Sequence, residues 1–128
     1  MLIESSSDLI SHLASVTMPN GIAGHEATLI NGNAVVVTHN ELALFRKAGD
    51  CVDPLGNGFI RSVVIPRENH IATDADQSPF IVEHRAGYVG LADGQVLLIT
   101  LNSIQMFPSK HAALRNENQI VELSLKSD

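Results

Sequence analysis

Six histidines are the residues of this chain that most invite a chemical interpretation. Neutral imidazole is a common ligand of zinc and related metals, and local metal motifs place two histidines only a few residues apart. The histidines stand at His12, His25, His39, His70, His84 and His111. No two of them are separated by one, two or three residues, so the sequence predicts no metal site.

The single cysteine and the acidic loop residues give no sharper signal. Cys51 stands close to Asp50 and Asp53, and neighbouring carboxylates raise the pKa of a thiol and oppose a reactive thiolate. Asp74 and Asp76 have a spacing that can hold Ca²⁺ or Mg²⁺, but the other acids and the glycine of a calcium loop are missing. We expect an ordinary thiol, a solvated acidic loop and no cofactor.

Motifs for nucleophilic or phosphate chemistry are absent from the sequence. The pattern Gly-x-Ser-x-Gly does not occur, and residues 55–58 have neither the lysine nor the spacing of a phosphate-binding loop. The densest ionisable run beside strand-like segments is 83–85. A ligand site at the junction of two halves of the chain would therefore draw on these polar residues: His39, Glu41, Arg61, Glu83, His84 and Arg85.

The elements that would position such residues begin with a predicted helix at 8–17. Ser5, Ser6 and Ser7 offer N-cap oxygens, and Asp8 completes a form of the capping box. Leucine, isoleucine, alanine and valine residues recur at helical spacing through the segment, and the sequence Pro-Asn-Gly at 19–21 ends it. We expect this helix to lie on a sheet.

Two β-hairpins follow the predicted helix. Asn31-Gly32 and Asp93-Gly94 are dipeptides that favour two-residue type I′ turns, because both central residues of that turn need a positive φ. The flanking segments are strand-like in composition: 25–30 and 33–38 in the first hairpin, 87–92 and 95–100 in the second.

The two hairpins are copies of one pattern, 62 positions apart. Residues 31–45 align with 93–107, and the pairs are identical at Gly32, Thr38, Asn40 and Phe45. Each copy leads through a variable connector to a third apolar run: 59–65 in the first and 120–125 in the second. Segment 40–49 fits a strand or a helix equally well, 109–115 fits the start of a short helix, and 80–83 fits an additional strand. We expect one domain, 1–128, with repeat units of approximately 25–66 and 87–126.

The predicted register of the second hairpin makes both of its faces apolar. A two-residue turn places Val89, Leu91, Val96 and Leu98 on one face. An antiparallel sheet with one wet face alternates apolar and polar residues instead, so a second layer or another subunit must cover these strands. We expect homo-oligomers, with these four residues as the candidate interface.

Composition indicates an acidic globular protein. Apolar residues make up 45% of the chain, charged residues 17%, and the formal net charge is −6. Nucleic acids and anionic membrane surfaces attract basic faces, so we expect neither as a partner. No apolar run reaches the length of a membrane span, and the first residues lack a signal-peptide pattern. A lone cysteine excludes an internal disulfide, and the expected compartment is the cytoplasm.

These patterns predict a β-dominated α+β fold. It consists of an N-terminal helix and a duplicated antiparallel hairpin-strand unit, which closes as a small barrel or a two-layer sandwich. The expected function is that of a small non-enzymatic, homo-oligomeric module for binding or assembly. The alternative is a β-barrel that binds a small molecule at the polar junction of its halves, for which an enzymatic role stays open.

Overall fold

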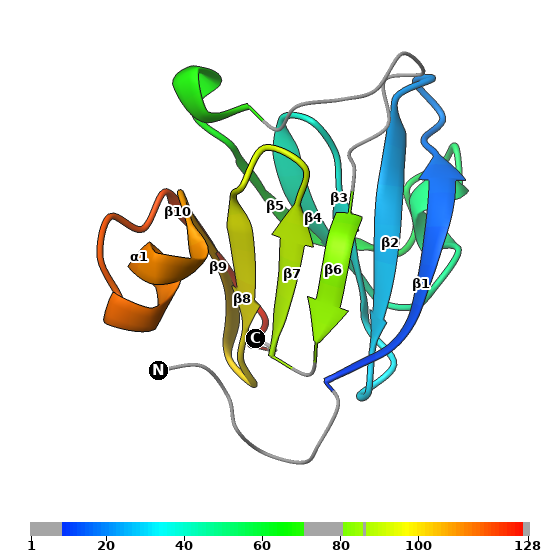
Figure 1. The fold of residues 1–128 in the computed structure, drawn as a ribbon. Coiled ribbons are helices and arrows are strands. Elements are labelled where there is room, and N and C mark those ends of the chain that lie inside the picture. Colours follow the sequence, from blue (N-terminus) through cyan, green and yellow to red (C-terminus); the bar gives the residue numbers. More distant parts are fainter. Residues whose placement is uncertain (1–8, 71–80, 86, 127–128) are drawn as a thin grey trace.

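The computed structural model describes residues 9–70, 81–85 and 87–126, except for the side chain of Arg67. In this part of the chain, ten strands form two five-stranded antiparallel sheets (Figure 1). The first sheet has the order β1 (Ile10–Thr17), β2 (Ala23–Leu29), β3 (Ala34–Val37), β4 (Glu41–Phe45) and β5 (Phe59–Val64). The second sheet has the order β6 (Ile81–Arg85), β7 (Tyr88–Leu91), β8 (Val96–Ile99), β9 (Ser103–Phe107) and β10 (Val121–Ser124). The described residues also form one short helix, α1 (Lys110–Arg115), and 3-10 turns at Asp50–Val52 and Arg67–Asn69.

The two sheets share one hydrophobic core. Its buried residues come from both sheets, among them Leu29, Val35 and Leu44 of the first and Val89, Leu97 and Met106 of the second. Further buried clusters lie on the other face of each sheet, under the segment around Cys51 in the first sheet and under α1 in the second. The β-dominated character predicted from the sequence is confirmed. The described strands pair as two separate sheets and not as a closed barrel.

The helix predicted at 8–17 is wrong, because β1 occupies this segment from Ile10 onward and pairs with β2. A bulge at Ser11 separates Ile10 from Leu13, and both pack in the shared core. Val16 packs on the opposite face of the sheet. Because of the bulge and the burial on both faces, the apolar residues Ile10, Leu13 and Val16 are three positions apart. This spacing resembles that of one face of a helix.

Both hairpins have three-residue loops instead of the predicted two-residue turns. In the first, the Gly32 N–H donates to the Leu29 carbonyl at 2.9 Å, and the Leu29 N–H donates to the Asn33 carbonyl at 2.7 Å. The φ of Gly32 is +95°, whereas Asn31 has no positive φ. This geometry is a type I turn followed by a glycine bulge. The Asn31 side chain stabilises it by accepting a hydrogen bond from the Asn33 N–H at 2.9 Å.

The additional loop residue shifts the predicted register by one position. In the second hairpin, Val96 lies opposite Gly90 instead of Leu91. The predicted grouping of four apolar residues on one face is therefore wrong. Val89 and Leu91 are buried in the shared core, whereas Val96 and Leu98 are buried under α1. The chain itself covers both faces of this hairpin.

Elements of the two halves recur at the spacing of the sequence repeat. β8 and β9 begin and end 62 positions after β3 and β4. Thr38 and Thr100 precede equivalent turns, and each hydroxyl accepts a hydrogen bond from the N–H three residues later, at 3.2 Å and 3.0 Å. The segment 40–49, which the sequence left open, contains β4.

The shorter predicted elements are also confirmed. The Ser109 hydroxyl accepts a hydrogen bond from the Ala112 N–H at 3.1 Å and begins α1 as its N-cap residue. The strand predicted at 80–83 is β6, with residue 80 outside the described part of the chain. In the described part, no helix has the length and apolar character that would let it cross a membrane.

Candidate functional site

The polar residues predicted to form one ligand site are not gathered in one place. They divide among three regions: His39 in the β3–β4 turn with Glu41 at the start of β4, Arg61 on β5, and Glu83, His84 and Arg85 on β6. Within β6, His84 lies opposite Val89 and faces the shared core, while its two neighbours lie on the outer face. The structure brings only some of the predicted residues together.

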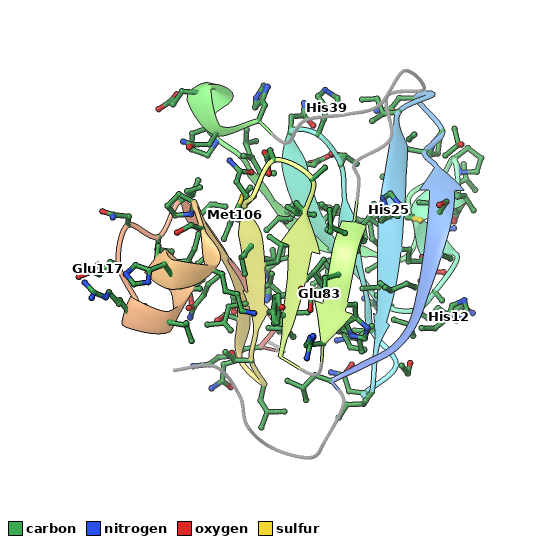
Figure 2. All side chains as sticks on the ribbon, in the orientation of Figure 1. His12, His25, His39, Glu83, Met106 and Glu117 are labelled. Atoms are coloured by element: carbon green, nitrogen blue, oxygen red, sulfur yellow. The ribbon has the colours of Figure 1, made fainter. Side chains whose placement is uncertain are left out.

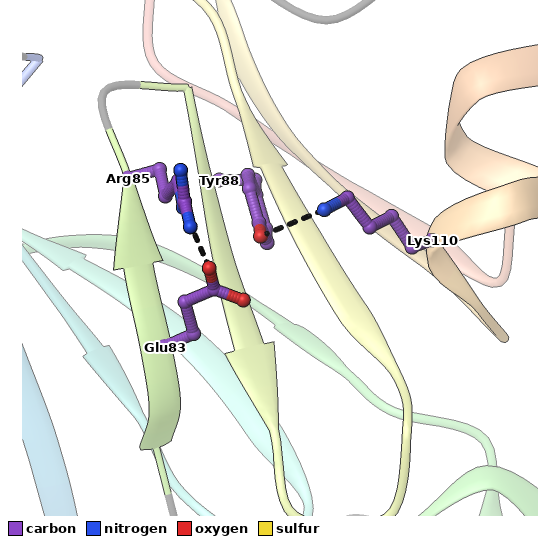
Figure 3. A network of polar contacts seen from close by, with 4 residues as sticks. All are labelled: Glu83, Arg85, Tyr88 and Lys110. Atoms are coloured by element: carbon purple, nitrogen blue, oxygen red, sulfur yellow. Dashed lines mark hydrogen bonds and ion pairs between the residues drawn. The ribbon is translucent and has the colours of Figure 1, made fainter.

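Glu83 and Arg85 belong to a polar network on the outer face of the second sheet (Figure 3). Arg85 Nε donates to the Glu83 carboxylate at 2.6 Å. Lys110 Nζ donates to the Tyr88 hydroxyl at 3.1 Å and lies 4.9 Å from the centre of its ring. The Tyr88 hydroxyl, and then Arg85, hold the pKa of the Glu83 carboxyl below its usual range. The network connects α1 with β6 and β7, which gives it a structural role.

The histidines do not converge on a metal site. Figure 2 shows His12, His25 and His39 spread over β1, β2 and the end of β3. Among the residues that the structure describes, no group of three histidine, cysteine, aspartate or glutamate side chains is placed to hold a metal ion. Asp74 and Asp76 lie outside the described residues.

Cys51 is a buried thiol next to a buried carboxylate. Its Sγ lies 3.4 Å from Oε2 of Glu26, which also accepts a hydrogen bond from the Gly49 N–H at 2.9 Å. Burial, and then the hydrogen bond to Glu26, raise the pKa of Cys51 to about 12. The sequence predicted the direction of this effect from the neighbouring aspartates, but Asp50 contributes least. This thiol is not suited to be a nucleophile at neutral pH.

An apolar cavity of about 250 Å³ opens at the end of the sheets that contains the β2–β3 loop and the β8–β9 turn. This is the lower end of the molecule in Figure 1. The side chains of both sheets form its wall: Leu9, Leu29, Ile30, Ile99, Leu101 and Leu125. Asn31 and Thr100 supply polar groups at its edge. Ile30 and Leu101 are 56% and 77% exposed, so large apolar surface faces solvent beside the cavity.

A second cavity, of about 380 Å³, is lined by three basic residues. Arg46 follows β4, Arg61 lies on β5, and Lys126 follows β10. Leu44, Ile60, Asn33 and Leu125 complete the lining. None of the described residues that line this cavity is an aspartate or a glutamate. Three of the eight lysine and arginine residues of the chain thus line one cavity.

The guanidinium group of Arg61 is fixed across the gap between the sheets. Its Nη1 donates to the carbonyl oxygens of Ser124 at 3.0 Å and Lys126 at 2.7 Å. Because β5 and β10 are edge strands of different sheets, these bonds connect the sheets at one side of the core. We call this second cavity the basic cavity. The hydrogen-bonded guanidinium group of Arg61 holds one of its walls in place.

The two cavities have Leu125 as a common wall. We call this end of the molecule, with both cavities, the open end. At the opposite end, His39 and Gln95 occupy the positions that correspond to Leu101 and Asn33 in the other repeat unit. Both contact the segment around the 3-10 turn Arg67–Asn69. His39 lies with its ring centre 6.1 Å from that of His70, and Gln95 Nε2 donates to the Asn69 carbonyl at 3.0 Å.

Sequence reasoning identified Arg61 but neither Arg46 nor Lys126 as a site residue. The sequence did not reveal how β4 pairs with β5. This pairing places Arg61 opposite Leu44 and therefore close to Arg46. The connector between these strands has no repeated or regular pattern from which their register follows. Lys126 joins the group only through the contact between the edges of the two sheets.

Comparisons of the chain with protein-family models, with curated proteins and with solved structures found no match.

Proposed function

We propose that this protein is a small non-catalytic binding module that takes a small molecule at the open end. We further infer that the chain is a single domain built from a duplicated unit, and that its two sheets face each other as the layers of a sandwich. The observation that carries the proposal is the apolar cavity, whose wall combines residues of both sheets.

The composition of the cavity wall supports this proposal. Pockets for small molecules are concave and mostly apolar, with a few polar groups that orient the ligand. Here leucine and isoleucine side chains supply the apolar wall, while Asn31 and Thr100 supply polar groups. Its volume of about 250 Å³ lies just below the range for such pockets, which begins at roughly 300 Å³, and this favours a small ligand.

Self-association is the competing explanation for the exposed apolar residues at the open end. The sequence favoured self-association because both faces of the second hairpin are apolar and must be buried. Residues of the same chain bury both of these faces. Ile30 and Leu101 are the apolar residues that stay exposed beside the cavity. An assembly that buried them would use this end as a subunit contact instead of a ligand site.

A titration with octan-1-ol tests the proposal. We expect saturable changes in the amide chemical shifts of residues 29–31 and 100–101, measured in assigned ¹⁵N–¹H spectra. Leu101→Glu places a charge beside the apolar cavity and should weaken binding at least tenfold. Leu55→Glu is the matched control, because Leu55 is 80% exposed but lines neither cavity.

Two results would contradict the proposal. One is a footprint away from the open end, or equal binding by Leu101→Glu and the unmodified protein. The other is a native mass of two or more chains, measured by light scattering, that falls to the mass of one chain in Leu101→Glu. The second result would identify this end as a subunit contact.

A further inference from the structure

Asn31 lies at the edge of the apolar cavity and has hydrogen-bond donors that its own loop does not use. Its Oδ1 accepts the hydrogen bond from the Asn33 N–H at 2.9 Å, and this bond fixes the plane of the side-chain amide. Nδ2 lies in the same plane and has two N–H donors. In the described part of the chain, no residue accepts a hydrogen bond from Nδ2. A ligand atom that accepts hydrogen bonds can therefore use a donor whose position the loop already holds.

The hydroxyl group of Thr100, the other polar side chain at this edge, is already engaged within the β8–β9 turn. It accepts hydrogen bonds from the N–H groups of Asn102 at 3.1 Å and Ser103 at 3.0 Å. It also donates to the Ser103 carbonyl at 3.2 Å. A hydroxyl group has one donor and two acceptor positions, so these bonds use all of them. Recognition of a polar ligand group by a side chain at this edge thus falls to Asn31.

The second repeat unit shows that the loop does not need the N–H donors of Asn31. Asp93 takes the place of Asn31 there, and its Oδ1 accepts a hydrogen bond from the Gln95 N–H at 3.0 Å. A carboxylate therefore forms the same loop bond as the amide, although it has no donor. An asparagine at position 31 adds donors to the edge of the cavity beyond what the loop requires.

The same loop of the second unit also shows which group a side-chain amide binds in this setting. Gln95, the counterpart of Asn33, donates from Nε2 to the carbonyl oxygen of Asn69 at 3.0 Å. That carbonyl oxygen belongs to the segment in contact with the opposite end of the molecule. A side-chain amide of this loop thus already serves as a donor to an uncharged carbonyl oxygen.

We propose that the ligand is an apolar molecule with an uncharged carbonyl group, and that Asn31 Nδ2 donates a hydrogen bond to its oxygen. This inference rests on the proposed function. A carbonyl oxygen that leaves water for an apolar wall costs free energy unless it finds a donor, and Nδ2 is that donor. None of the described residues that line the apolar cavity is charged, so an ionised group there would lose its solvation without gaining an ion pair.

Titrations with hexan-2-one and hex-1-ene, followed by amide chemical shifts, test the inference. The two probes have chains of the same length, and only the ketone has an acceptor oxygen. Asn31→Asp keeps the oxygen that accepts from the Asn33 N–H and removes the donors. We expect it to weaken hexan-2-one binding about fivefold and to leave hex-1-ene binding unchanged. Asn33→Asp is the matched control, because it adds the same charge but does not line the apolar cavity, and it should alter neither affinity.

The carbonyl stretching band of bound, ¹³C-labelled hexan-2-one gives a readout that is independent of affinity. Hydrogen bonding lowers the frequency of this band, so we expect a lower frequency in the unmodified protein than in Asn31→Asp. A band at the frequency of the ketone in hexane, measured in the unmodified protein, would overturn the inference whatever the variants show.

The outcomes separate this inference from the proposed function. Equal weakening of both probes by Asn31→Asp would overturn the assignment, since the effect would then come from the added charge. An unchanged affinity for hexan-2-one in Asn31→Asp would overturn it as well. In both cases, a footprint of the probes at the open end of the unmodified protein would leave the proposed function standing. No binding of either probe at the open end would overturn the proposed function itself.

Discussion

The Nη1 atom of Arg61 lies 2.7 Å from the carbonyl oxygen of Lys126 and so connects the edge of one sheet with the end of the other. The contact has two consequences. It closes one side of the shared core with a hydrogen-bonded cation, and it brings two positive side chains to the same cavity. One residue thus contributes both to stability and to the electrostatics of the open end.

Replacing Arg61 with methionine should destabilise the fold. The substitution keeps a long apolar side chain but removes the donors to two carbonyl oxygens. Hydrogen bonds that involve a charged group contribute a few kcal/mol when buried and less when exposed, so we expect a loss of roughly 1 kcal/mol. Urea denaturation measures this change. Lys47→Met should leave the unfolding midpoint unaltered, and an equal midpoint for both variants would contradict the structural role of Arg61.

The thiol of Cys51 should resist modification in the folded protein. Its pKa is raised to about 12, so almost no thiolate is present at pH 8. We expect reaction with a disulfide reagent only after addition of denaturant, measured by absorbance. Rapid reaction of the native protein would show that the segment over Cys51 opens readily.

The same thiol should make stability depend on alkaline pH. The folded-state pKa is raised above its ordinary value of 9.0, so the unfolded chain loses this proton first. The contribution is fully present below pH 9 and is lost as the pH rises toward 12. Cys51→Ala should flatten this part of the stability curve. A slope that is the same with and without the thiol would assign the effect to other groups.

Glu26 should be needed to hold the segment that follows β4. Its carboxylate is 4% exposed and accepts hydrogen bonds from the Gly49 N–H and the Cys51 thiol. Glu26→Ala removes both acceptor contacts and should cost roughly 1–3 kcal/mol of unfolding free energy. Glu26→Gln keeps an acceptor oxygen and should cost less. Equal losses in the two variants would show that packing, and not hydrogen bonding, governs this position.

Gly32 should be intolerant of a side chain. Its φ of +95° disfavours any residue with a Cβ, so Gly32→Ala should destabilise the protein by about 1 kcal/mol. Gly90 is the matched control, because it has no such φ and an added Cβ would meet its nearest neighbours at 3.7 Å. Gly90→Ala should be neutral or slightly stabilising. The melting temperatures of the two variants compare the positions. An unchanged melting temperature in Gly32→Ala would contradict the loop geometry.

The sequence identified the strands that have strong local signals. Gly32 and Gly94 marked both hairpins, and Ser109 marked the start of α1. It misidentified β1, where a bulge at Ser11 and burial on both faces gave apolar residues a helical spacing. Local sequence patterns do not reveal such a bulge, because it is fixed by pairing with β2.

The candidate site was less accessible to sequence reasoning than the fold. The sequence predicted a ligand site from His39, Glu41, Arg61 and the run 83–85, but these residues lie on separate elements. Those of the run also divide between the two faces of β6. The basic cavity combines Arg46, Arg61 and Lys126, which are far apart in the chain. Their proximity depends on the pairing of β4 with β5 and on the contact between the sheets, and neither is encoded by a local motif.

The most direct test is to locate octan-1-ol by isotope-filtered nuclear Overhauser measurements on the labelled protein. A ligand in the apolar cavity predicts contacts from its chain protons to the methyl groups of Leu29, Ile99 and Leu125. Contacts only with residues away from the open end would contradict the account.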